Sequence, residues 1–298
     1  MVAWACLPGG SVHETTVAAT KRSDETRCPT TMKYYLTVPV AVAIASARLW
    51  AQHDDAKWVA DCLDQSHHED HARYCEVRVD HLASGGPIDV DGRENGAVEI
   101  MGGSRSDVVV HELVEAEAST DAEAKDMASQ VHVTTSGGRI HADGPPYHGR
   151  WRSWTVSYRI EVPHKADVTA ESTNGPVEAS DVAGQLDLRS ENGPISLYAV
   201  GGNVRARTEN GPVEVTLTGA RWDGAGLDAE TENGPVELTL PASYAAHLET
   251  GTVNGPMSIG FPITVSGRFD MKRLSTDVKG GGPTVRVVTT NGPVTVDH

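Results

Sequence analysis

Aromatic residues are scarce in this sequence: they make up 5% of the 298 residues, and only 2 of them are Phe. This scarcity argues against a bulky aromatic core, and the abundance of Gly, Val, Thr and Ala favours thin strands closed by turns. Positive charge is also scarce, because 25 Lys and Arg stand against 41 Asp and Glu. Phosphate binding needs clustered Lys and Arg, so no nucleic-acid partner is expected.

Long apolar runs are missing as well, and no run reaches the ~20 residues that span a membrane. The apolar stretch over 34–47 follows the positively charged Lys33 and is followed by small residues. This order is typical of a secretory signal peptide, which we place at 32–51. The protein is then exported to the periplasm, the cell surface or the medium. Residues 1–31 are either a disordered leader or the product of a misplaced start codon.

Cysteine is rare too, with 4 in the chain. Only Cys62 and Cys75 follow the expected signal peptide, and an even pair in an oxidising compartment favours a disulfide. The pair lies in a Cys/His-rich N-terminal segment over 52–80. The same segment holds a weak candidate for a zinc or copper site, for which a solvated polar loop is the competing interpretation. The candidate ligands are His67, His68 and His71.

One short motif is abundant. Asn-Gly-Pro recurs between alternating apolar runs at intervals of about 20 residues, a period typical of a solenoid. The copies are Asn174-Gly175-Pro176, Asn192-Gly193-Pro194, Asn210-Gly211-Pro212, Asn233-Gly234-Pro235, Asn254-Gly255-Pro256 and Asn291-Gly292-Pro293. We expect one β-repeat domain over 81–298, with regular repeats from 166.

Each repeat predicts two strands and two turns. Apolar residues alternate along the strands, and the inward residues shrink to Ser or Thr just before each Asn. An Asn-Gly hairpin is the competing interpretation, but Pro has no N–H with which to close the hairpin pair. We therefore predict an all-β solenoid with Asn-Gly-Pro at its corners. There Asn and Gly would adopt positive φ, Asn amides would stack in a ladder, and Ser or Thr would bond the turn backbone.

A single helix is expected within the repeat domain, over 119–131. Thr120 and Glu123 fit a capping box, and small apolar residues recur at helical spacing behind them.

Three carboxylates form the second candidate site. Glu191, Glu209 and Glu232 each precede an Asn and would line up on one outer edge of stacked coils. Such close like charges are unfavourable unless a cation such as Ca²⁺ bridges them or arginines neutralise them. We favour neutralisation, by Arg189, Arg205 and Arg207, so no cofactor is expected.

Catalytic motifs are absent from the sequence, including Gly-x-Ser-x-Gly, His-Glu-x-x-His and the P-loop. The carboxylates of Glu178, Asp181 and Asp187 are conceivable acid–base groups, but nothing singles them out. No catalytic residue is assigned.

Several motifs follow one another over about 75–298: Cys75-Glu76-Val77-Arg78, then TDAEAKDMASQVHV with SGGRIHADGP behind it, then YRIEVP and the Asn-Gly-Pro array. In this order they resemble the bacterial putative adhesin family, exported β-strand-repeat proteins with a domain of unknown function. They are also similar to auto-transporter adhesin head domains. The resemblance implies a β-helix-like fold, an envelope or surface location, and no established catalytic residues.

The expected function is that of an exported, non-enzymatic binding or scaffold module. Its partner would be a glycan, a matrix polymer or an envelope protein. The final strand, VTVDH at 294–298, is expected to be an uncapped edge at which a partner could pair. A carbohydrate-active enzyme (polysaccharide lyase or hydrolase) and an envelope-stress sensor are the alternatives.

Overall fold

The computed structural model describes residues 55–64, 71–83, 85–146, 152–262 and 272–298. The predicted leader and signal peptide, together with His67 and His68, lie outside these ranges. The described chain is mostly β-strand, with one helix over 55–64 and a second, α2 (Asp121–Ser129). No helix in the described part of the chain is long and apolar enough to cross a membrane.

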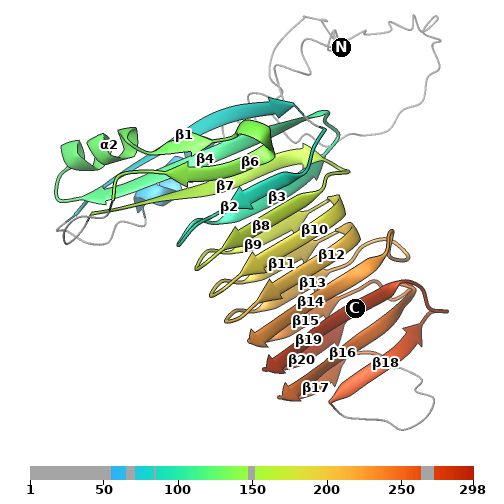
Figure 1. Ribbon diagram of the computed structural model, residues 1–298. Coiled ribbons are helices and arrows are strands. Elements are labelled where there is room, and N and C mark those ends of the chain that lie inside the picture. The colour runs from blue at the N-terminus through green and yellow to red at the C-terminus, as the bar shows by residue number, and fades with distance from the viewer. Residues whose placement is uncertain (1–54, 65–70, 84, 147–151, 263–271) are drawn as a thin grey trace, which may run out of the picture. The chain divides into compact units, whose positions relative to one another are not determined.

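The strands form two large mixed sheets of 10 strands each (Figure 1). Sheet A has the order β1 (Ala72–Ala83), β4 (Asp107–Ala118), β7 (Ser153–Pro163), β3 (Val98–Gly103), β9 (Val177–Ser180), β11 (Ile195–Tyr198), β13 (Val213–Thr216), β15 (Val236–Thr239), β20 (Val294–Asp297), β17 (Met257–Ile259). Sheet B has the order β18 (Arg273–Val278), β16 (Ala246–Asn254), β19 (Thr284–Asn291), β14 (Gly226–Asn233), β12 (Gly201–Thr208), β10 (Ala183–Ser190), β8 (Val168–Ser172), β2 (Ile88–Asp91), β6 (Arg139–Asp143), β5 (His132–Thr134).

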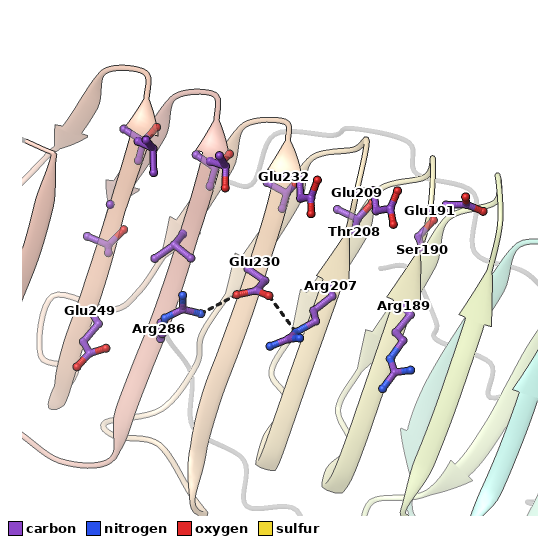
Figure 2. Close-up of a pocket in the computed structure, with 18 of the residues that line it drawn as sticks. Arg189, Ser190, Glu191, Arg207, Thr208, Glu209, Glu230, Glu232, Glu249 and Arg286 are labelled. Atoms are coloured by element: carbon purple, nitrogen blue, oxygen red, sulfur yellow. Dashed lines mark hydrogen bonds and ion pairs between the residues drawn. The ribbon is translucent and has the colours of Figure 1, made fainter.

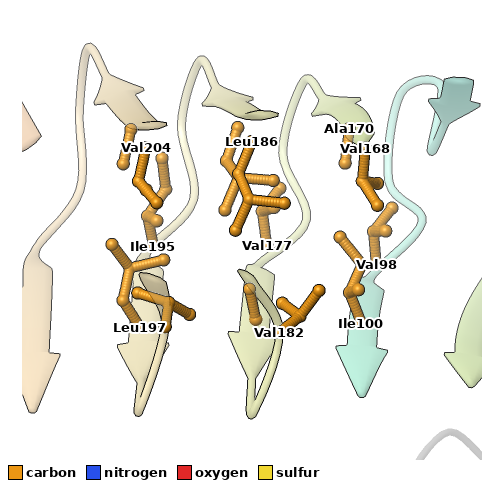
Figure 3. Packing of buried hydrophobic residues seen from close by; sticks show 14 of the residues in the cluster. Val98, Ile100, Val168, Ala170, Val177, Val182, Leu186, Ile195, Leu197 and Val204 are labelled. Atoms are coloured by element: carbon orange, nitrogen blue, oxygen red, sulfur yellow. The ribbon is translucent and has the colours of Figure 1, made fainter. Parts of the chain in front are cut away.

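From β8 to β15 the chain passes from one sheet to the other at every connection. Neighbouring strands there are parallel and in register, so that Leu186 pairs with Val204 and Ile195 with Val213. Their alternate side chains fill the space between the sheets (Figure 3). The fold is therefore β-rich, as the composition predicts, and its core consists largely of Val, Leu, Ile and Ala.

Helix α2 lies against β1 and β4, which pair antiparallel with each other. It is two residues shorter at each end than the predicted 119–131. The hydroxyl of Thr120 accepts a bond from the backbone N–H of Glu123 at 3.3 Å, which caps the N-terminus. At the other end, where the last turn contains no basic residue, Arg78 donates to the carbonyls of Ala128 and Val131. An arginine from β1 thus satisfies carbonyl groups that the helix leaves unpaired.

The last strands of the chain do not lie at the end of either sheet. β19 lies between β14 and β16, and β20 lies between β15 and β17. The expectation that 294–298 forms an unpaired edge is therefore wrong, because β20 has a parallel neighbour on both sides. The edges at this end are the short β17 and the charged β18.

Each Asn-Gly-Pro lies where the chain leaves sheet B for sheet A. One strand of sheet B and the sheet A strand that follows it are here called a coil. The asparagine side-chain amides of neighbouring coils hydrogen-bond to one another at 2.8–3.0 Å, in the order Asn95, Asn174, Asn192, Asn210, Asn233, Asn291, Asn254. Inside this ladder, hydroxyls donate to glycine carbonyls of the neighbouring coil, as Thr208 does to Gly193 at 2.8 Å.

The expectation of positive φ at these corners is wrong, since neither the Asn nor the Gly residues of the motif adopt it. The glycines serve close packing instead. A Cβ on Gly193 would lie 2.2 Å from the carbonyl oxygen of Gly175, and a Cβ on Gly211 would lie 2.3 Å from that of Gly193.

Candidate functional site

The outer face of sheet B carries a shallow groove of about 1150 Å³ beside the Asn-Gly-Pro corners (Figure 2). It crosses the stacked strands from Asp91 in β2 to Arg273 in β18. Its described lining is mostly charged or hydroxyl-bearing, with a few apolar side chains such as Leu274, and it includes no aromatic side chain. Parallel pairing in register produces this groove, because equivalent outward residues of successive coils stand about 4.8 Å apart in rows.

Charges of opposite sign pair across the rows of the groove. Glu230 lies between two arginines, 3.0 Å from Nε of Arg207 and 3.0 Å from Nη1 of Arg286 (Figure 2). Arg189 pairs with Asp187 of its own strand at 2.8 Å. These pairs are partly exposed and contribute little to stability. Their effect is to present donors and acceptors side by side, without a large field of either sign.

The predicted neutralisation of the Glu191, Glu209 and Glu232 ladder by arginine is wrong for Arg189 and Arg207. Those side chains pair with other acids, and in the described part of the chain the three glutamates, and Arg205, have no ion pair. The glutamates are exposed and line the groove next to the corners (Figure 2). The register of the strands places the three glutamates on successive coils. The backbone N–H of Glu209 donates to the carbonyl of Ser190, next to Glu191, and the N–H of Asn233, next to Glu232, donates to the carbonyl of Glu209.

No cluster of three or more His, Cys, Asp or Glu side chains within the described ranges could hold a metal ion. The row of Glu191, Glu209 and Glu232 therefore does not surround a common position that a metal ion could occupy. Of the histidines predicted as metal ligands, only His71 lies within the described residues. Cys62 and Cys75 are joined by a disulfide. The bond ties the helix over 55–64 to β1, where Trp58 and Val59 pack near Leu113.

The three carboxylates considered as acid–base groups, Glu178, Asp181 and Asp187, have different environments in the structure. Glu178 is on the outer face of sheet A, and burial raises its pKa, with Glu99 and Glu214 adding to the effect. Asp181 occupies a turn with φ of 53°, and Asp187 pairs with Arg189. The structure does not bring these three side chains together in one site.

A Ser–His–Asp arrangement, which sequence patterns did not reveal, lies on β16 and β18 at the end of the groove. Nδ1 of His247 is 2.7 Å from a carboxylate oxygen of Asp277, and Nε2 is 3.1 Å from the hydroxyl of Ser275. Glu249 approaches Nε2 to 3.5 Å. Ser275 and Asp277 alternate on one strand and His247 faces Asp277 across the antiparallel pair, so only knowledge of the pairing reveals the group.

These features define a class: a β-rich protein of two facing sheets whose repeated coils present a polar groove. The family model described as Toastrack DUF4097 matches residues 83–297. The chain therefore belongs to this family, which confirms the resemblance to adhesin-like proteins of unknown function.

The solved structures to which the chain is similar include a "putative cell adhesion protein" from Clostridium sporogenes ATCC 15579, with 11% identity, a TM-score of 0.43, and coverage of 76% of this chain and 99% of that one. Another is a "putative adhesin" from Bacteroides fragilis NCTC 9343, with 9% identity, a TM-score of 0.37, and coverage of 74% and 96%. No curated protein matches the chain.

Proposed function

We propose that the chain is an exported, two-sided β-solenoid that acts as an adhesin-like binding module at the cell surface or in the periplasm. Its repeat domain begins near residue 81, and it has no catalytic role. The ligand is an extended, largely uncharged glycan that lies along the sheet B groove. The observation that carries the proposal is the groove itself, which runs across the stacked coils from Asp91 to Arg273.

The chemistry of the groove favours hydroxyl-bearing polymers. Arg189, Arg207 and Arg286 are engaged with Asp187, Asp228 and Glu230, so little positive charge is left on these three side chains for a polyanion. Glu191, Glu209 and Glu232 repeat the same acceptor on successive coils along the groove, and a polymer with a repeating unit can bond to several of them at once. Many weak polar contacts then add together through effective concentration.

The test is retention of the full chain on immobilised neutral and acidic polysaccharides. We expect retention on one neutral polymer, and we expect Arg207→Ala to weaken it by about tenfold, because a charged hydrogen-bonding group is worth ~1.5–3 kcal/mol. Arg139→Ala is the matched control, since Arg139 is exposed on sheet B but does not line the groove. Equal retention of both variants, or no retention of the unchanged protein, would contradict the proposal.

A hydrolase is the second candidate, and the contacts of His247 are the observation in its favour. With a proton on Nδ1 facing Asp277, Nε2 can accept the proton of Ser275, which is the relay that serine hydrolases use. Ser275 also lines the groove. Against this, the Asp277 side chain is largely exposed, and a carboxylate oxygen of Glu249 lies 3.5 Å from Nε2, so that Ser275 is not the only group near this nitrogen.

A fluorophosphonate probe separates the two candidates. If the module is only a binder, Ser275 stays unlabelled after long incubation, and hydrolysis of 4-nitrophenyl acetate by the protein equals that by its Ser275→Ala variant. Labelling of Ser275 that disappears in His247→Ala, but persists in the control His164→Ala, would establish the hydrolase instead.

A further inference from the structure

A second cavity, here called the corner pocket, lies beneath the turn that joins β2 to β3. Its volume is about 420 Å³, within the ~300–1,000 Å³ range of small-molecule sites. It shares Asp91, Arg93 and Thr173 with the groove, so the two form one continuous surface. Trp154 and Tyr158 of β7 contribute to its wall and supply the aromatic groups that the groove lacks.

The Tyr158 hydroxyl is the unusual group in this wall. The residue is 1% exposed, and its oxygen has no hydrogen-bond partner among the described residues. A buried polar group without a hydrogen-bond partner costs free energy. A ligand atom that bonds to this hydroxyl would remove that cost. Burial raises the pKa of this hydroxyl far above its ordinary value, and the carboxylates of Glu112 and Asp91 raise it further. The hydroxyl therefore keeps its proton and can donate it to a hydrogen bond.

The mouth of the pocket is held in a strained conformation. Arg93 has φ of 52°, which costs a residue with a side chain ~1–2 kcal/mol. Its N–H donates to Asp91 at 2.8 Å, and its guanidinium lies 3.4 Å from Asp143. Backbone strain of this kind clusters at ligand sites. With Glu94 also lining the pocket, acids outnumber the single arginine at the mouth, and the field there is negative.

Contacts within the protein hold the Trp154 side of the corner pocket in place. The indole N–H of Trp154 donates to the carbonyl of Pro145 at 2.8 Å, and the backbone of Gly144 lies against the ring, where a Cβ would come within 2.6 Å. The pocket is thus preformed, which reduces the entropy that a ligand must overcome on binding.

We propose that the corner pocket binds the terminal, uncharged sugar ring of the glycan that lies in the groove, with the Tyr158 hydroxyl donating to a ring hydroxyl. This inference rests on the proposed function. A sugar hydroxyl can accept from Tyr158 while its neighbours donate to Asp91 and Glu94, which line the pocket. The C–H face of the ring suits the side of the pocket near Trp154. The negative mouth disfavours uronic acids and other anionic sugars.

The experiment uses the full chain and free monosaccharides, so that the pocket is tested without the groove. Methyl glycosides of glucose, galactose, mannose and N-acetylglucosamine, with glucuronic acid for comparison, are titrated and followed by saturation-transfer NMR. We expect one neutral glycoside to bind, glucuronic acid to bind more weakly, and Tyr158→Phe to weaken the neutral sugar by about tenfold. Tyr244→Phe is the matched control, because Tyr244 is also buried but does not line the pocket.

The outcomes separate the pocket from the groove. Failure of every neutral glycoside to bind, or equal binding by Tyr158→Phe, overturns the pocket assignment. The proposed function survives that result if a polysaccharide is still retained in an Arg207-dependent way. Loss of stability in Tyr158→Phe with unchanged sugar binding would show that the hydroxyl is structural, because removal of an unpartnered hydroxyl should leave the thermal midpoint unchanged or raised.

Discussion

Gly193→Ala is expected to destabilise the repeat stack by about 3 kcal/mol, a cost typical of overpacking a rigid interior. The added methyl would lie 2.2 Å from the carbonyl oxygen and 2.7 Å from the carbonyl carbon of Gly175, and 2.8 Å from the hydroxyl of Ser190. The neighbouring backbone cannot move aside, because Ser190 and the asparagine ladder hold it on both sides of the corner. The measurement is urea unfolding followed by circular dichroism.

Gly103→Ala is the matched control. Gly103 ends β3, a Cβ there would meet nothing within 4 Å, and its φ is not positive. Its replacement should leave the midpoint unchanged or raise it, since alanine lowers the entropy of the unfolded chain by the equivalent of ~0.4–1 kcal/mol. Similar midpoints for the two variants would mean that the corners tolerate a side chain, and that the glycines are present for another reason.

At these corners, the local sequence determines the path of the chain but not the packing between coils. Proline's missing N–H was enough to predict that Asn-Gly-Pro joins two sheets. The role of the glycine was not predictable in the same way, because it depends on how closely one coil approaches the next. A corner at Asn95-Gly96 was also missed, since Ala97 replaces the proline there. The string ENGAVEI, so close to ENGPVEV, was the available sign.

The order of the last coils could not be predicted from alternation. A period of two tells which side chains of β20 face inward, but every strand of sheet A shares that pattern, so the pattern does not identify the neighbours. The same limit applies to the groove. Arg189 and Arg207 stand 18 residues apart, yet their partners depend on the register of coils whose lengths differ. Pairing in space, rather than spacing in sequence, decides which charges meet.

The second large effect is expected from the buried carboxyl of Glu112, which should make the unfolding free energy depend on pH. Its side chain faces the interior from β4, it is 2% exposed, and its Oε1 has no hydrogen-bond partner in the described structure. Burial raises its pKa to about 7; Asp80 adds to the rise, while Arg78 opposes it. Arg78 is itself bonded to Glu76 and to the last carbonyls near α2, so it compensates only in part.

The folded protein therefore binds a proton at Glu112 that the unfolded chain releases near pH 4.5. Stability from this group is complete below that pH, falls as the pH rises toward about 7, and is lost above it. At ~1.4 kcal/mol per pKa unit the loss is about 3 kcal/mol. Glu112→Gln stays uncharged, so its unfolding free energy relative to the unchanged protein should rise by that amount between pH 4.5 and pH 8.

Urea titrations of both proteins across this range measure the difference directly, and other ionisable groups cancel because they are common to both. Glu237→Gln, at an exposed position of β15, controls for the loss of one carboxylate and should run parallel to the unchanged protein. If Glu112→Gln also runs parallel, the carboxylate is charged and stabilised within the fold. In that case a group near Tyr158, which pairs with Glu112 across β4 and β7, must stabilise the charged carboxylate of Glu112.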